Sequence, residues 1–194
     1  MAFIFVMSFY NFGLSLKRER DVQRGVDLGY LYDRLNEYQT DFGFYPPSDE
    51  NGKIIACKGE NFEEVINSLK DAEQFDLDAY FKGLEPCEWG VDSFSDILED
   101  NGKVYIPLLP RDPKAKIGRR YFYISNTRRF QIYSYLEGNE DQTGYDGKIV
   151  ARNLNCGGVI CSFGRGSGST ALDKTLEEYE NELIKEQAEN ENKK

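Results

Sequence analysis

RERDVQRGVDLGYLYDRLNEYQTDFGFYPPS, residues 18–48, is the stretch that decides the fold. Its apolar side chains recur at spacings of three and four, which is one face of an α-helix; they are Leu28, Leu31, Leu35, Tyr38 and Phe42. Val22 and Val26 extend the helical pattern upstream. Gly43 is a plausible terminator, and the prolines at 46 and 47 forbid continuation.

The twenty residues at the start of the chain, MAFIFVMSFYNFGLSLKRER, are apolar and then abruptly charged. They lack the basic residues that open a secretory signal peptide. Their apolar part is shorter than the roughly 20 residues that span a bilayer. We therefore expect one helix from about residue 2 to 42, about 60 Å long. Its first third would sit in lipid or against apolar neighbours, so the helix needs partners outside its own domain.

The amino-acid composition narrows the range of possible functions. The 194 residues contain no histidine, which removes the commonest general base and zinc ligand and lowers the prior for an enzyme. Carboxylate or lysine chemistry remains open, but nothing marks a converging pair of carboxylates. A formal net charge of −10 argues against a protein that coats nucleic acid.

Four cysteines form an even set: Cys57, Cys87, Cys156 and Cys161. Two disulfides with three possible connectivities are favoured, and an oxidising compartment with them. Free buried thiols are the first alternative. A four-cysteine zinc site is the second, although no C-x-x-C pair is present.

Short elements follow the first helix. Helical patterns cover residues 62–69 and 77–84, and a further turn or two is expected at 94–98. A short strand follows at 103–106, and residues 120–125 and 129–136 alternate as a β-hairpin. We expect Phe122, Ile124, Ile132 and Leu136 to face the first helix, with the tyrosines of both strands on the alternate positions. Residues 164–170 are a flexible linker by composition, and a last acidic helix follows.

Two charged stretches suggest ligands. Glu137, Asn139, Asp141 and Asp146 offer oxygens from one loop, as calcium prefers; acidic turn residues without metal are the alternative. A basic cluster on the acidic chain suggests DNA capture, or else a stripe that is solvated or pairs with acidic faces of neighbours. Its members are Lys114, Lys116, Arg119, Arg120, Arg128 and Arg129.

The chain resembles the type IV pilin superfamily, and especially the major pseudopilins of type II secretion. The resemblance rests on residues 18–48, on VYIPLLPRDPK at 104–114, and on YFYISNTRRFQIYSYLEGNEDQ at 121–142. It covers about two thirds of the chain, through the order and spacing of these motifs. It implies a helix that anchors the subunit in the inner membrane and bundles into a filament core after processing. It also implies calcium in a loop near residues 137–147.

Two features depart from the family pattern. The cleavage glycine with the Phe-Thr-Leu-Ile-Glu sequence that follows it is absent, as is the first half of the apolar helix. We interpret the start of this sequence as the second half of a pilin helix, from a truncated gene model or a degenerate subunit. No peptidase-site residue is carried over.

The sequence thus predicts an α+β fold: a long N-terminal helix packed on a small antiparallel sheet, with a helical insertion and a C-terminal helical tail. The predicted parts are a helix at 1–44 (1–16 apolar), a pilin-like domain at 45–163, the linker at 164–170 and an acidic helix at 171–194. The leading hypothesis is a structural filament subunit, anchored in the inner membrane with its domain outside the cytoplasm. Its partners would be copies of itself, other pilins and their assembly machinery. The alternative is a membrane-tethered adhesin or minor-pilin binding module. Candidate subunit contacts are Arg18, Glu19, Arg20, Asp21 and Arg24.

Overall fold

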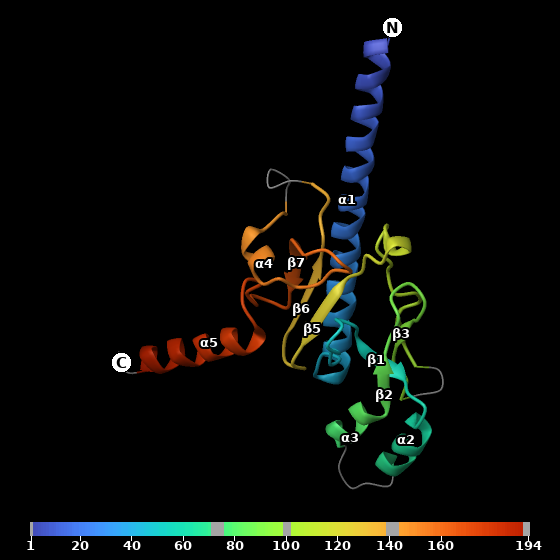
Figure 1. The fold of residues 1–194 in the computed structure, drawn as a ribbon. Coiled ribbons are helices and arrows are strands. Elements are labelled where there is room, and N and C mark those ends of the chain that lie inside the picture. The colour runs from blue at the N-terminus through green and yellow to red at the C-terminus, as the bar shows by residue number, and fades with distance from the viewer. Residues whose placement is uncertain (1, 71–75, 99–101, 139–143, 192–194) are drawn as a thin grey trace.

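A single long helix, α1 (Ala2–Phe42), dominates the computed structural model (Figure 1). The structure describes residues 2–70, 76–98, 102–138 and 144–191. Leu28, Leu31 and Leu35 are fully buried on one side of the helix, which confirms the apolar face predicted from their spacing. The chain leaves the helix through Gly43, whose positive φ of 82° favours glycine.

A three-stranded antiparallel sheet packs on the lower half of α1, so the predicted α+β class is confirmed. Its strands are β5 (Phe122–Ser125), β6 (Phe130–Ser134) and β7 (Phe163–Gly166), in the order β5-β6-β7. Tyr123 lies opposite Ile132, and Phe122 lies opposite Tyr133. The predicted hairpin is therefore present.

The predicted faces of β5 are reversed. Tyr123 and Ile132 belong to the core cluster around α1, whereas Phe122 and Ile124 pack on the opposite face beside Tyr133. Directly opposed residues of an antiparallel pair share a face, so Phe122 and Ile132 lie on different sides of the sheet. The assignment to α1 was correct for Ile132 and wrong for Phe122 and Ile124.

An insertion of small elements follows α1 at the lower end of the molecule (Figure 1). It contains β1 (Ile55–Lys58), α2 (Phe62–Lys70), α3 (Leu77–Lys82) and β2 (Leu84–Pro86), where β1 pairs with β2. The Cys57–Cys87 disulfide ties its two ends together. Next, β3 (Phe94–Ser95) pairs with β4 (Val104–Ile106), so the helical turn predicted at 94–98 is a strand at its first two residues.

The C-terminal third adds η1 (Ala115–Ile117), α4 (Gly147–Ala151) and α5 (Leu176–Glu191). The prediction of a flexible linker at 164–170 is wrong for its first three residues, because residues 163–166 form β7 and pair with β6. Glycine serves packing here: a Cβ on Gly164 would lie 2.7 Å from the Tyr133 ring. In Figure 1, α5 extends away from the sheet. None of the described helices combines the length and apolarity that a membrane crossing requires.

Candidate functional site: a charge cluster where the helix leaves the domain

Six charged side chains meet where α1 emerges from the globular body, and we call them the helix-exit cluster. At its centre is Arg24, whose side chain is fully buried. Its Nε donates to Asp112 at 2.8 Å and its Nη2 donates to the other Asp112 oxygen at 3.1 Å. This bidentate pair ties α1 to the proline-rich loop before η1. The cluster comprises Arg20, Asp21, Arg24, Asp112, Lys114 and Glu137.

The chain after β6 is held by the same cluster. Asp21 accepts hydrogen bonds from the backbone N–H groups of Glu137 at 2.9 Å and Gly138 at 3.0 Å, and from Arg24 at 2.7 Å. Glu137 accepts from Arg20 at 2.6 and 2.7 Å, from Lys114 at 2.7 Å and from Arg24 at 3.0 Å. Two loops distant in sequence are therefore fixed to one turn of α1.

The cluster balances three cations against three carboxylates. Burial alone would raise the pKa of Glu137, but hydrogen bonds from Arg20, Lys114 and Arg24 outweigh it and lower the pKa to about 2. Burial also opposes the charged form of Arg24, yet its bonds to Asp112, Glu137 and Asp21 hold its pKa above the ordinary value. Such paired charges fix geometry more than they add net stability, so the cluster sets the direction in which α1 leaves the domain.

Another buried carboxylate, outside the cluster, lies one turn further along α1. Asp27 accepts a 2.5 Å hydrogen bond from the Tyr121 hydroxyl and a 2.7 Å bond from the Gln23 amide. Burial raises the pKa of Asp27, and the two hydrogen bonds offset only part of that shift. The folded protein thus disfavours the ionised form of Asp27, whereas it favours the ionised form of Glu137.

Above the cluster, α1 has little covering. The side chains of Asn11, Phe12 and Lys17 are exposed, and Phe12 is 62% exposed. Within and below the cluster, Val22 and Val26, which extend the helical pattern, are also exposed, at 66% and 59%. Phe12, Val22 and Val26 thus present apolar surface that the described residues of the chain do not cover.

The five predicted subunit contacts divide into two groups. Arg20, Asp21 and Arg24 belong to the helix-exit cluster, and Asp21 and Arg24 are buried inside the chain, where a neighbour does not reach them. Arg18 and Glu19 are exposed and form no hydrogen bond or ion pair with the described residues. Of the five, these two remain available to a partner.

The structure describes two of the four predicted calcium ligands, and both have partners within the chain. Glu137 faces three cations, and Asp146 caps α4 by accepting from the N–H of Lys148 at 2.8 Å. Asn139 and Asp141 lie outside the described residues. Among the side chains that the structure describes, no group of three or more acidic or cysteine residues is placed to hold a metal ion. Glu137, surrounded by positive charge, does not fit a calcium site.

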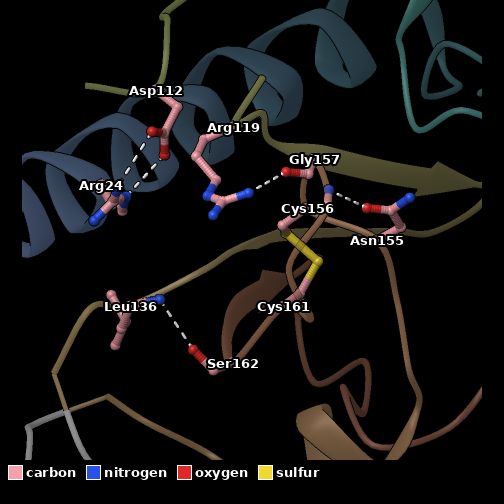
Figure 2. The surroundings of a disulfide bond; sticks show 10 residues. Arg24, Asp112, Arg119, Leu136, Asn155, Cys156, Gly157, Cys161 and Ser162 are labelled. Atoms are coloured by element: carbon pink, nitrogen blue, oxygen red, sulfur yellow. Dashed lines mark hydrogen bonds and ion pairs between the residues drawn. A yellow bond between two sulfur atoms is a disulfide. The ribbon is translucent and has the colours of Figure 1, made fainter. Parts of the chain in front are cut away.

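A disulfide loop braces the chain beside the cluster (Figure 2). Cys156 and Cys161 are bonded with a Cα–Cα distance of 5.2 Å, and the Arg119 guanidinium donates to the Gly157 carbonyl at 2.5 Å. A Cβ on Gly157 would lie 1.9 Å from the Gly118 carbonyl oxygen, so only glycine fits. With the Cys57–Cys87 pair, this bond accounts for all four cysteines, and the prediction of disulfides is confirmed.

The basic cluster of the sequence disperses in the fold. Lys114 pairs with Glu137, Arg119 with the Gly157 carbonyl and Arg129 with Glu180 at 4.0 Å. Lys116 and Arg128 remain exposed. Half of the predicted basic residues thus have partners within the chain, which weakens the DNA interpretation.

Sequence reasoning missed the partners that complete the helix-exit cluster. One signal was present: Arg24 lies four residues before Leu28 and seven before Leu31, so it falls on the apolar face of α1. An arginine on such a face needs buried carboxylates. Its main partner, Asp112, stands in the Leu-Pro-Arg-Asp-Pro motif at 109–113.

Comparisons of the chain with protein-family models, curated proteins and solved structures found no match.

Proposed function

We propose that this chain is a non-catalytic structural subunit of a filament like a type IV pilus or a type II secretion pseudopilus. One observation carries the proposal: the N-terminal part of α1 stands clear of its own domain, with Phe12 62% exposed. Exposed apolar helix of this length favours burial against other helices. Copies of the same helix are the partners that a repeating filament supplies.

The helix-exit cluster supports this proposal mechanically. A subunit that assembles through one helix must hold its domain at a fixed angle to that helix, or successive copies will not repeat. Through side chains that are almost completely buried, Arg24 binds the loop that contains Asp112 and Asp21 binds the chain at Glu137. The exposed Arg18 and Glu19, one turn above, would then set the register between neighbours.

The two disulfides support a domain outside the cytoplasm, because such bonds persist in oxidising compartments. The apolar first turns of α1 would hold the subunit at the inner membrane before assembly. The filament would then lie in the periplasm or at the cell surface.

Electron microscopy of the full chain, purified in mild detergent that is then removed, tests the proposal. We expect helical filaments with α1 at their centre and the sheet domain outside. Matched samples of Phe12→Asp should assemble poorly, because a buried charge at that position is costly. A uniform population of monomers under every condition would contradict the proposal and favour a tethered binding module.

A further inference from the structure

The outer edge of the sheet is covered by a tight turn of residues 48–54, which we call the edge turn. Strand β5 is the outermost strand in the order β5-β6-β7. The backbone N–H of Tyr123 donates to the Gly52 carbonyl at 2.9 Å, and the N–H of Ser125 donates to the Ser48 hydroxyl at 3.1 Å. An uncovered edge strand offers such groups to other chains, and a covering loop prevents that pairing. The edge turn therefore protects β5.

Gly52 is the tightest point of contact between the edge turn and β5. Its φ of 77° favours glycine. The residue is buried, and a Cβ there would lie 2.5 Å from the Phe122 ring and 2.9 Å from the Phe122 Cα. The Gly52 carbonyl thus reaches the N–H of Tyr123 only while the main chain of the turn keeps its present path.

Asn51, which directly precedes this glycine, has an exposed side chain. Its Nδ2 lies 3.4 Å from a carboxylate oxygen of Asp49. The N–H of Gly52 donates to the Asp49 carbonyl at 3.3 Å. Both distances exceed those of a typical hydrogen bond. The Asn51 amide and the backbone nitrogen that follows it are therefore loosely held.

Two other asparagines are held more firmly. Asn126 accepts from the N–H of Arg129 at 2.9 Å and donates to Glu180 at 2.9 Å. Asn155 accepts from the N–H of Gly158 at 2.7 Å. Among the asparagines that the structure describes, Asn51 alone precedes a glycine, so the nitrogen next to its side chain has no neighbouring Cβ to shield it.

We infer that Asn51 is a site of spontaneous deamidation, and that its isoaspartate product releases the edge turn from β5. In the first step the backbone nitrogen of Gly52 gives its proton to solvent and attacks Cγ of Asn51. The N–Cγ bond forms and the Cγ–Nδ2 bond breaks, so the nitrogen of the amide leaves as ammonia after taking a proton from solvent. The product is a cyclic succinimide.

Water then opens the succinimide at one of its two carbonyl carbons, and nothing is oxidised or reduced. Attack at Cγ breaks the new bond and yields aspartate with an unchanged main chain. Attack at the other carbonyl breaks the original peptide bond to Gly52 and yields isoaspartate, whose main chain runs through Cβ and Cγ. That main chain is one carbon longer. Because Phe122 confines Gly52, the longer turn does not keep the Gly52 carbonyl on the N–H of Tyr123.

This inference does not depend on the proposed filament. The reaction needs only water, so it proceeds with the age of the molecule in either a free subunit or an assembled one. Its consequence is an uncovered edge of β5, where the N–H groups of Tyr123 and Ser125 lose their partners. Failure of either idea leaves the other standing.

Peptide mass spectrometry of the folded full chain, incubated in mildly alkaline buffer, tests the site. Cleavage after lysine and arginine puts Asn51 and Asn101 on different peptides, so the second asparagine that precedes a glycine is counted separately; Asn101 lies outside the described residues. We expect Asn51 to deamidate at least about tenfold faster than Asn126 and Asn155, because of the unshielded nitrogen that follows it. Incubation in heavy-oxygen water should label the products. An Asn51 that stays intact in the folded chain, while it deamidates in the urea-unfolded chain, would overturn the inference.

Amide hydrogen exchange at Tyr123 and Ser125 tests the consequence. Protein that carries isoaspartate, identified with an isoaspartyl methyltransferase and isolated by chromatography, should exchange both amides at least about tenfold faster than fresh protein, because the edge turn no longer protects them. Asn51→Asp is the matched control, since it has the charge of the product but the native main chain, and it should exchange slowly. Asn51→Gln should keep slow exchange after the same incubation. Equal exchange in the isoaspartate form and in Asn51→Asp would overturn the release of the edge turn.

Discussion

At the scale of single residues, two buried carboxylates show how the surroundings decide whether a pKa is raised or lowered; one lies on α1 and the other on a neighbouring loop. Glu137 accepts hydrogen bonds from three cations, which lower its pKa to about 2 despite burial. Asp27 is bound by a hydroxyl and an amide, and burial raises its pKa. Ionisation of Glu137 therefore stabilises the folded state, whereas protonation of Asp27 stabilises it.

Glu137→Gln should therefore destabilise the fold by about 2 to 3 kcal/mol at neutral pH, because three charged donors lose an ionised acceptor. The depressed pKa means that the ionised group contributes stability above its ordinary pKa of 4.5, and that this contribution is lost as pH falls toward 2. Urea unfolding at pH 7 and pH 3 measures the effect, with Glu182→Gln at a surface pair as the control. A difference from wild type that does not shrink in acid would contradict this account.

Asp27→Asn should behave in the opposite way. A raised pKa in the folded state means that protonation favours folding, and that this contribution fades as pH rises through the folded-state value. The asparagine variant is then closest to wild type, or more stable, at pH 7, and it loses that advantage at pH 3. The same unfolding measurements apply, with the exposed Asp33→Asn as control. A loss of more than about 2 kcal/mol at pH 7 would show that ionised Asp27 stabilises the fold.

At the scale of elements, patterns with one buried face were predictable and patterns with two were not. Lower α1 has a single apolar face, so its core residues Leu28, Leu31 and Leu35 followed from spacing alone. The sheet is covered on both sides, by α1 and by the cluster around Ile149. Period-two alternation then offers two apolar faces and does not say which one meets the helix, so Phe122 was misplaced.

Glycine misled the reading of β7 for a related reason. Residues 164–170 have the composition of a linker. Glycine is nevertheless required at 164 and 166 for packing, because Tyr133 and Thr170 leave no room for a side chain there. The helix-exit cluster escaped prediction because its members are far apart in sequence: the Arg24–Asp112 pair spans 88 positions. Local patterns carry no information about such pairs.

The two disulfides should differ in what they contribute. In the loop-entropy description, a bond that closes 30 positions stabilises by about 4 kcal/mol and one that closes 5 positions by about 2 kcal/mol. Replacing Cys57 and Cys87 by alanine should therefore cost more than replacing Cys156 and Cys161. Thermal and urea unfolding of the two double variants measure this order. The reverse order would show that the short loop is a structural brace for η1 and not mainly an entropic constraint.

At the scale of the whole molecule, the chain is a small body from which two helices project. Above the helix-exit cluster α1 extends in one direction, and α5 extends in another. Both carry exposed apolar side chains, Phe12 on α1 and Ile184 on α5. Further copies that covered these two helices would bury this exposed apolar surface, which is the basis of the proposed filament.

The most direct test of that claim is crosslinking between α1 helices. The Phe12→Cys chain, assembled by detergent removal and treated with a bismaleimide, should yield a covalent dimer as the main product. Val91→Cys, 70% exposed on the globular body, is the control that should yield little. Dimer in the Phe12→Cys sample alone, lost when detergent keeps the chains apart, is the predicted result. Equal and low crosslinking at both positions would contradict assembly through the N-terminal helix.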